Sequence, residues 1–156
     1  MTNPNPDRNI IVETVCRVMI PFVQLFALYV IIHGAGGPGG GFQGGVVLGS
    51  SFILYIVAYD LKGGKGRFPE SSRTYFSALG LYIYAGIGLL AMIFSRGAAQ
   101  FLNYGFIPFT SHFTENRALG MDFVEIGIGI TVMAVTASIF FDLAEKDEEP
   151  GTDPKG

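Results

Sequence analysis

Residues 33–45 read His-Gly-Ala-Gly-Gly-Pro-Gly-Gly-Gly-Phe-Gln-Gly-Gly, and they lie between two apolar runs that are each long enough to cross a lipid bilayer. In water a glycine-rich stretch is easily tolerated, because solvent satisfies its backbone N–H and C=O groups. At membrane depth those groups must instead be bonded by protein or by a water-filled cavity. We therefore expect protein neighbours around these residues, which we call the glycine segment, and we expect the chain to belong to a larger assembly.

The composition is that of a membrane protein. Of the 156 residues 49% are hydrophobic and 15% are charged, whereas about 25% are charged in an ordinary soluble domain. Four apolar windows are each about 27–35 Å long as helices, which matches a hydrocarbon core of about 30 Å. These windows are 10–32, 42–59, 75–94 and 121–141. We predict an all-α, polytopic integral membrane protein with four transmembrane helices, in which residues 1–145 form a single membrane domain and residues 146–156 a disordered acidic tail.

The basic residues predict how these helices are oriented. With four spans, the N-terminus, the connection 60–74 and the C-terminus lie on one side of the membrane. The basic residues of that side outnumber those of the other by eight to two: Arg8, Arg17, Lys62, Lys65, Arg67, Arg73, Lys146 and Lys155 against Arg96 and Arg117. The positive-inside rule therefore predicts that both termini and the tail are cytoplasmic, and that the glycine segment and the connection 95–120 face outward.

Several chemistries are disfavoured by the sequence. Residues 34–39 match the dinucleotide-binding pattern G-x-G-x-x-G, but an apolar helix precedes them where that fingerprint needs a strand. The single cysteine, Cys16, excludes an intrachain disulfide and a cysteine-based metal cluster. We therefore predict no catalytic site, no cofactor, no metal centre and no nucleic-acid partner.

The glycines are better explained by chain geometry and helix packing. Pro38 fixes its own φ and residues 39–41 tolerate positive φ, so a tight turn between two helices is expected there. Phe42 then opens the second helix, in which Gly45 and Gly49 form a small-residue face that lets another helix approach closely. The residues assigned in this way to structure and assembly are Pro38, Gly39, Gly40, Gly41, Phe42, Gly45 and Gly49.

Five polar residues in or beside the predicted spans are candidates for an ion path or an ion pair: Glu13, Arg17, Gln43, Asp122 and Glu125. Glu13 and Arg17 are four residues apart, and a pair is expected because an unpaired charge at the bilayer centre costs about 2.5–3.5 kcal/mol. Gln43 is expected to face protein rather than lipid. Asp122 and Glu125 stand at the outer start of the fourth predicted helix, where the helix dipole favours acids. Glu125 lies one turn deeper and is the stronger candidate for a proton relay, with a structural role as the alternative.

The connection 95–120 is rich in aromatic residues and is interrupted by Pro108. We interpret it as an interfacial loop with aromatic anchors, and the alternative is a segment laid against a neighbouring subunit. His112 in this connection and His33 at the start of the glycine segment are interpreted as surface residues.

The glycine segment also resembles a family signature. The run Pro38-Gly-Gly-Gly-Phe42-Gln-Gly-Gly45, followed by an apolar helix that ends at Tyr59-Asp60, is similar to the MnhB subunit of Mrp-type (Mnh-type) multisubunit cation/proton antiporters. The stretch from Gly120 through Asp122 and Glu125 to Leu143 resembles the closing helix of that family. The resemblance covers about residues 10–145. It departs upstream of the proline, where the family often has a histidine three residues earlier and this chain has Ala35.

The resemblance implies a small subunit of a membrane complex that exchanges Na⁺, or another monovalent cation, for H⁺ across the plasma membrane of a prokaryote. It implies other membrane subunits and lipid as partners, and a part in assembly or in the cation route rather than an enzymatic activity. Related subunits also occur in hydrogenase-like and respiratory ion-pumping complexes, which is one alternative. A stand-alone four-helix transporter is the second alternative, although it would not explain the glycine segment.

Overall fold

The computed structural model describes residues 6–34, 39–59, 64, 66, 68–95 and 100–148. Its long helices in these residues are α1 (Pro6–Ile32), α2 (Gly41–Tyr59), α4 (Glu70–Phe94) and α5 (Phe113–Glu148), and a short 3₁₀ helix, η1, covers Tyr104–Phe106. Each long helix is apolar and long enough to cross a membrane. The prediction of an all-α chain with four such helices is therefore confirmed.

Helix α5 is longer than the window 121–141 predicted. It has 36 residues, which extend over about 54 Å at about 1.5 Å per residue, well beyond a hydrocarbon core of about 30 Å. The hydropathy window missed both ends because they are polar, reading Thr-Glu-Asn-Arg at 114–117 and Glu-Lys-Asp-Glu at 145–148. Polar residues end an apolar window without ending a helix. The predicted tail 146–156 lies outside the described residues from 149 onward.

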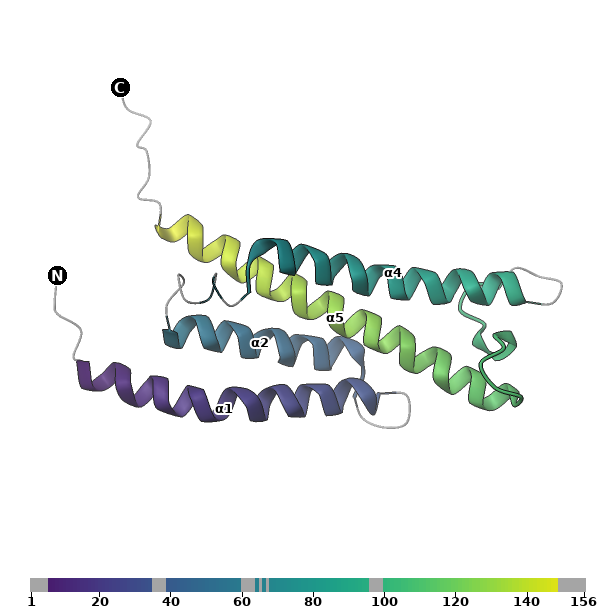
Figure 1. Cartoon of the computed structure of the whole chain (residues 1–156), viewed down its shortest axis with the longest axis horizontal. Coiled ribbons are helices and arrows are strands. Elements are labelled where there is room, and N and C mark those ends of the chain that lie inside the picture. Colours follow the sequence, from purple (N-terminus) through teal and green to yellow (C-terminus); the bar gives the residue numbers. More distant parts are fainter. Residues whose placement is uncertain are drawn as a thin grey trace, which may run out of the picture.

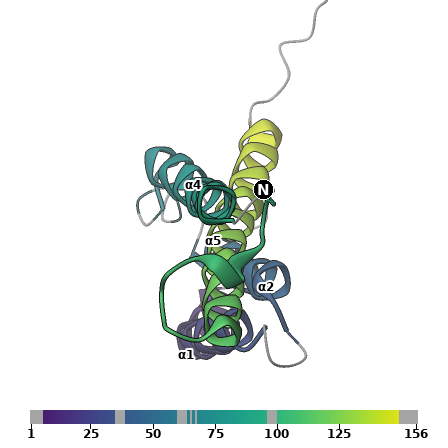
Figure 2. The same cartoon turned by 90° about the vertical axis from the view of Figure 1, so that its right-hand side faces the viewer.

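Helix α5 is the central element of the fold. It packs along α4 on one side and along α2 on the other, and α2 in turn packs along α1. Figure 1 shows α5 running obliquely across the other helices, and the end-on view in Figure 2 shows α1 and α4 on opposite flanks. Helices α1 and α4 begin, and α2 and α5 end, at what we call the terminal end. The opposite end, which holds the glycine segment and residues 100–112, is the turn end.

Glycine residues allow α5 to lie close to its neighbours. A Cβ atom added to Gly45 of α2 would lie 2.7 Å from the carbonyl oxygen of Gly129 in α5. On the other side of α5, a Cβ added to Gly80 of α4 would overlap the carbonyl oxygen of Gly127. Gly49 also faces α5, so the small-residue face predicted on the second helix is used for packing within this chain.

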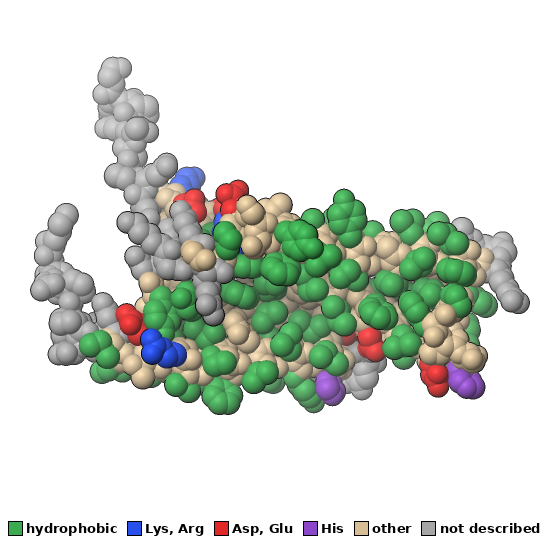
Figure 3. Space-filling view, viewed as in Figure 1, with side chains coloured by type: hydrophobic (Ala, Val, Ile, Leu, Met, Phe, Trp, Pro, Cys, Tyr) green, Lys and Arg blue, Asp and Glu red, His purple; other side chains and the backbone are tan. Residues whose placement is uncertain are grey.

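The outer surface of the four helices is largely apolar. Tyr82 and Ile93 on α4 are 76% and 74% exposed, and Phe22 on α1 is 64% exposed. Hydrophobic side chains cover most of the face in Figure 3, whereas the few charged side chains visible there lie toward the two ends. A surface of this kind needs lipid or another membrane subunit to cover it.

The connection between α4 and α5 folds back onto its own chain. Asn116, which is buried near the start of α5, accepts a hydrogen bond from the backbone N–H of Thr110 at 2.7 Å and donates one to its carbonyl oxygen at 3.2 Å. Further back, the ring of Phe101 occupies the space beside Gly88 of α4. Phe101 is nevertheless 48% exposed, so the connection also presents aromatic surface to the outside.

We expect Gly80→Ala to destabilise the fold, because the new Cβ overlaps backbone atoms of α5 and must push α4 away. Overpacking of this kind costs about 1–3 kcal/mol. Gly86→Ala is the matched control, since no atom lies within 4 Å of the Cβ position at Gly86 in the same helix. Thermal unfolding of the full chain in detergent, followed by circular dichroism, should show a lower midpoint for Gly80→Ala only. Equal midpoints for both variants would contradict the close approach of α4 to α5.

Candidate functional site

The two described arms of the glycine segment close on α5 at Glu125. A Cβ added to Gly34 would overlap the carboxylate of Glu125, and a Cβ added to Gly41 would overlap its backbone carbonyl. Between these arms Gly40 has φ of +143°, a conformation that side-chain-bearing residues rarely adopt, and its N–H donates to the carbonyl oxygen of Val30 at 3.2 Å. Glycine is therefore needed at positions 34 and 41 because Glu125 packs directly against them, and at position 40 because of its positive φ.

One oxygen of the Glu125 carboxylate has no hydrogen-bond partner among the described residues. This atom, Oε2, is also buried. A buried polar atom in this state is costly, and a proton, a cation or an ordered water would supply what is missing. The carboxylate therefore lies against the glycine segment, with its Oε2 atom shielded from solvent.

The helix dipole does not account for Glu125 or for Asp122, and this corrects the sequence-based interpretation. Helix α5 begins at Phe113, so the acid in its first turn is Glu115. Asp122 and Glu125 lie more than two turns further along, where the backbone N–H groups are already bonded within the helix and the dipole has little effect. The polar residues 114–117 concealed the true start of the helix.

Of the other candidate residues in the glycine segment, some pack against the rest of the chain and others are exposed on its surface. Pro38 lies outside the described residues, and Gly39 packs near the carbonyl oxygen of Val30, 2.8 Å from its Cβ position. Phe42 is 61% exposed and Gln43 is exposed beside it at the start of α2. The described part of the chain therefore leaves these two side chains largely uncovered.

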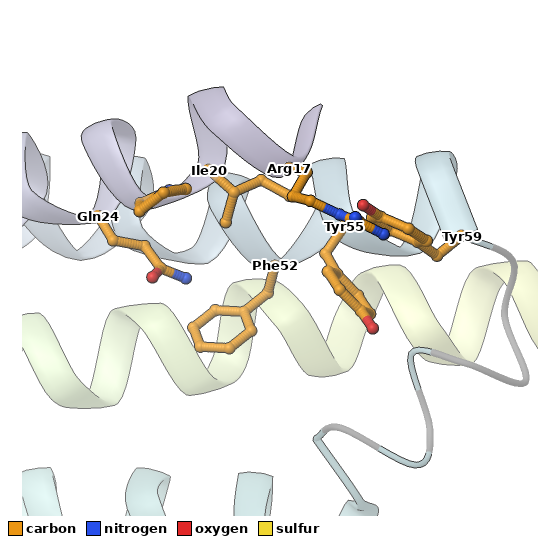
Figure 4. A pocket seen from close by; sticks show the side chains of 7 residues that line it. Arg17, Ile20, Gln24, Phe52, Tyr55 and Tyr59 are labelled. Carbon is orange, nitrogen blue, oxygen red and sulfur yellow. The ribbon is translucent and has the colours of Figure 1, made fainter. Parts of the chain in front are cut away.

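A set of polar side chains also lies between α1 and α2, toward the terminal end. These side chains line a cleft of about 420 Å³ (Figure 4). Its lining combines one cation, one amide and two phenols with apolar side chains: Arg17, Ile20, Pro21, Gln24, Phe52, Tyr55 and Tyr59.

Glu13 and Arg17 do not form the ion pair that their spacing predicts. No ion pair joins these two described residues. Instead the hydroxyl of Tyr59 donates to the backbone carbonyl of Glu13 at 3.1 Å, and the guanidinium of Arg17 lies beside Tyr59 (Figure 4). A signal for this contact was present in the sequence, because an antiparallel pair of helices brings the end of α2 to the start of α1.

Arg73 is the residue that the sequence-based reasoning missed. It was counted only as a basic residue near one membrane surface, yet its side chain is 4% exposed and its guanidinium carbon lies 4.1 Å from the centre of the Phe141 ring. Phe141 lies 68 positions further along the chain, and nothing in the local pattern around Arg73 indicates that contact.

Comparisons with known proteins agree with this architecture. Residues 11–138, which include parts of all four long helices, match the family model described as "Domain related to MnhB subunit of Na+/H+ antiporter". The chain is 27% identical to the B-subunit of the Na(+)/H(+) antiporter of Bacillus subtilis, over 93% of this chain and 99% of that protein. It is 26% identical to the protein of the same name from Alkalihalophilus pseudofirmus, over 89% and 94%. It is 25% identical to the putative antiporter subunit mnhB2 of Staphylococcus haemolyticus, over 88% and 96%.

Proposed function

Since this chain belongs to the MnhB family of Na⁺/H⁺ antiporter subunits, we propose that it is a small membrane subunit of a multisubunit monovalent cation/proton antiporter. The observation that carries the proposal is the family match across all four membrane helices. Names of full-length relatives support it, because the chain aligns with almost their whole length. The role is one of transport and assembly rather than catalysis.

The surface of the chain supports partners in the membrane. Phe42 and Gln43 at the start of α2 are exposed in the part of the chain that the structure describes, and α1 contacts little besides α2. We assign these surfaces to other subunits of the antiporter and the remaining apolar surface to lipid. A stand-alone transporter or a hydrogenase-like host complex is not favoured by the comparisons, since the relatives named above are antiporter subunits.

Within this function we assign Glu125 to the route of the exchanged ions, with H⁺ or Na⁺ as the transient partner of its carboxylate. The unbonded Oε2 atom supports the assignment, as does the absence of a helix-dipole explanation. Ionisable side chains in membrane helices are expensive and commonly mark such routes. Asp122, one turn earlier on α5, belongs to the same group. We assign the Arg17–Tyr59 contact and Glu13 to the structure of the terminal end, because Tyr59 joins α2 to α1 there by its hydrogen bond to the backbone carbonyl of Glu13 and by its contact with Arg17.

We also propose that both termini lie in the cytoplasm and that the membrane in question is the plasma membrane. Residues 1–145 would then form one membrane domain, with an acidic cytoplasmic tail at 146–156. The basic residues support this orientation, since Arg73 and Lys146 lie at the terminal end and Arg117 lies at the turn end.

The subunit function can be tested by reconstitution. Proteoliposomes that contain this chain alone should show no Na⁺-driven proton flux, measured with a trapped pH-sensitive dye, because the chain lacks the partners that cover its surfaces. Proteoliposomes with the complete antiporter should show exchange, and omission of this chain should abolish it. Flux from the isolated chain would favour the stand-alone transporter, and full exchange without the chain would refute the proposed role.

Glu125→Gln keeps the shape of the side chain and removes its ability to take up a proton. If the carboxylate serves the ion route, the complex should assemble normally on native gels while exchange in vesicles falls or its pH profile shifts. Glu115→Gln is the matched control, because Glu115 is exposed in the first turn of α5 and its loss removes only a dipole interaction of about 0.3–1 kcal/mol. Full exchange with an unchanged pH profile in Glu125→Gln would assign Glu125 to structure.

The orientation can be tested with single cysteines in a Cys16→Ala background. Gly66→Cys at the terminal end has open space for a side chain, and Ser111 at the turn end is exposed. An impermeant thiol reagent applied to intact cells should label Ser111→Cys and leave Gly66→Cys unmodified, because the positive-inside rule places the terminal end in the cytoplasm. Labelling of Gly66→Cys alone would reverse the orientation.

A further inference from the structure

The carboxylate of Glu125 lies at the C-terminal end of α1. Helix α1 ends at Ile32, and a Cβ added to Gly34, just beyond that end, would overlap the Oε2 atom of Glu125. The last carbonyl groups of a helix have no partner within it, so this end of α1 carries a partial negative charge. The start of α2 has the opposite polarity, but its first residue, Gly41, contacts the backbone carbonyl of Glu125 rather than the carboxylate. A carboxylate beside a negative helix end is unfavourable unless a cation lies between them.

Among the described residues, no cationic side chain lies beside this carboxylate. Helix α2 contains no charged residue, and α1 contains none after Arg17. The ring of His33 is turned back along α1, because it stacks on Tyr29 with 4.1 Å between ring centroids and its Nδ1 atom lies 3.2 Å from the carbonyl oxygen of Tyr29. Asp122, one turn before Glu125 on α5, adds negative charge to the same region.

The residues outside the described ranges do not supply a positive charge here either. Residues 35–38 read Ala-Gly-Gly-Pro and have no charged side chain. Gly80 of α4 packs against Gly127 of α5, and from Gly80 to its last residue α4 continues for about 21 Å. Glu125 lies only about 3 Å from the level of Gly127, so Arg96, which follows α4, is farther away than an arginine side chain extends. The connection between α2 and α4 and both chain ends are attached at the opposite, terminal end.

We propose that the carboxylate of Glu125 and the C-terminal carbonyl groups of α1 bind a monovalent cation, which is Na⁺ during exchange. Carboxylate and carbonyl oxygens are the ligands that hard cations take, and the C-terminal ends of interrupted membrane helices bind Na⁺ in this way in transporters. The one carboxylate that contacts this helix end balances a single positive charge. The choice of Na⁺ rests on the proposed function, because the relatives are named as Na⁺/H⁺ antiporter subunits.

A cation suits this site better than a proton alone does. A protonated carboxyl is neutral, so it gains nothing from the negative end of α1, and its O–H group still needs an acceptor. A cation is attracted by the carboxylate and by the helix end together. Gly34, Gly40 and Gly41 place backbone rather than side chains around the carboxylate, so carbonyl oxygens can approach the ion. Na⁺ and H⁺ then compete for one carboxylate, which couples the release of one ion to the binding of the other.

Labelling with a carbodiimide tests the site, because this reagent modifies a protonated carboxyl group and does not modify one that holds a cation. The complete antiporter complex in detergent is treated with a fluorescent carbodiimide at fixed pH in choline chloride, with or without NaCl at constant ionic strength. Peptide mass spectrometry then identifies the modified residue. Glu125 should be modified in choline chloride, and saturating Na⁺ should slow its modification about tenfold or more by mass action.

Two variants of Glu125 and one internal control accompany this measurement. Glu125→Gln should lose the label. Glu125→Asp should keep it but need more Na⁺ for protection, because the shorter side chain withdraws the carboxylate from Gly34. Any modification of Glu115, which is exposed in the first turn of α5, should not depend on Na⁺. The wild-type complex and Glu125→Asp give the result even if Glu125→Gln fails to assemble.

The contribution of α1 is tested separately. Ile32→Lys adds a positive charge at an exposed position in the last turn of α1, and it should raise the Na⁺ concentration for half-protection about two- to fivefold. Ile11→Lys is the matched control, since Ile11 is an exposed isoleucine at the other end of the same helix. The same half-protection concentration in Ile32→Lys as in the wild type would overturn the part assigned to α1.

The outcomes separate this proposal from the proposed function. Modification of Glu125 that Na⁺ does not slow would overturn the cation site and leave a proton route intact, whereas no modification in Na⁺-free medium would overturn both. Protection by Mg²⁺ at lower concentrations than Na⁺ would overturn the assignment to a monovalent ion. Protection by Na⁺ together with full exchange in Glu125→Gln would support the cation site and refute its role in transport.

Discussion

The close approach of α5 to the helices on either side is the constraint on which the rest of the structure depends. Lipid is as apolar as the helices, so their association relies on van der Waals contact and on backbones that can come near one another. Gly45 and Gly80 allow the backbones of α2 and α4 to contact α5 on its two sides. At the turn end, Gly34 and Gly41 allow the glycine segment to contact α5 in the same way. Because the glycine segment lies directly on α5 there, the Oε2 atom of Glu125 is covered and has no hydrogen-bond partner among the described residues.

Among the described residues, buried side-chain nitrogen and oxygen atoms without a partner occur only in Arg73 and Glu125. One is a cation at the terminal end, and the other is an acid at the turn end. Both are too far from each other to pair, since they lie near opposite ends of long helices. Each is therefore a buried polar group whose bonding partner is not among the described residues. In both places the fold shields these atoms from solvent, and no described residue forms a hydrogen bond to them.

Most of the fold could be predicted from the sequence, because hydropathy, charge and glycine content act locally. They located four helices and identified the glycine segment as a part that needs protein cover. The site was only partly predictable. Glu125 was identified as a candidate, but its position under Gly34 and Gly41 depends on how α5 packs. The contact of Arg73 with Phe141 depends on the same packing. Glu13 and Arg17 have the i,i+4 spacing of an ion pair, but each contacts Tyr59 instead. The spacing therefore permits an ion pair without requiring one.

The central position of α5 has a consequence for biosynthesis. Helices α1 and α2 contact each other extensively and can pair as soon as both have left the ribosome, whereas α4 makes its main helix contacts with α5. During translation α4 therefore enters the membrane before its main partner within the chain exists. Until α5 has been made, the surface of α4 at Gly80 lacks the helix that packs against it in the folded chain. The order of the helices thus makes the insertion of α5 the step that converts two separate membrane pieces into one subunit.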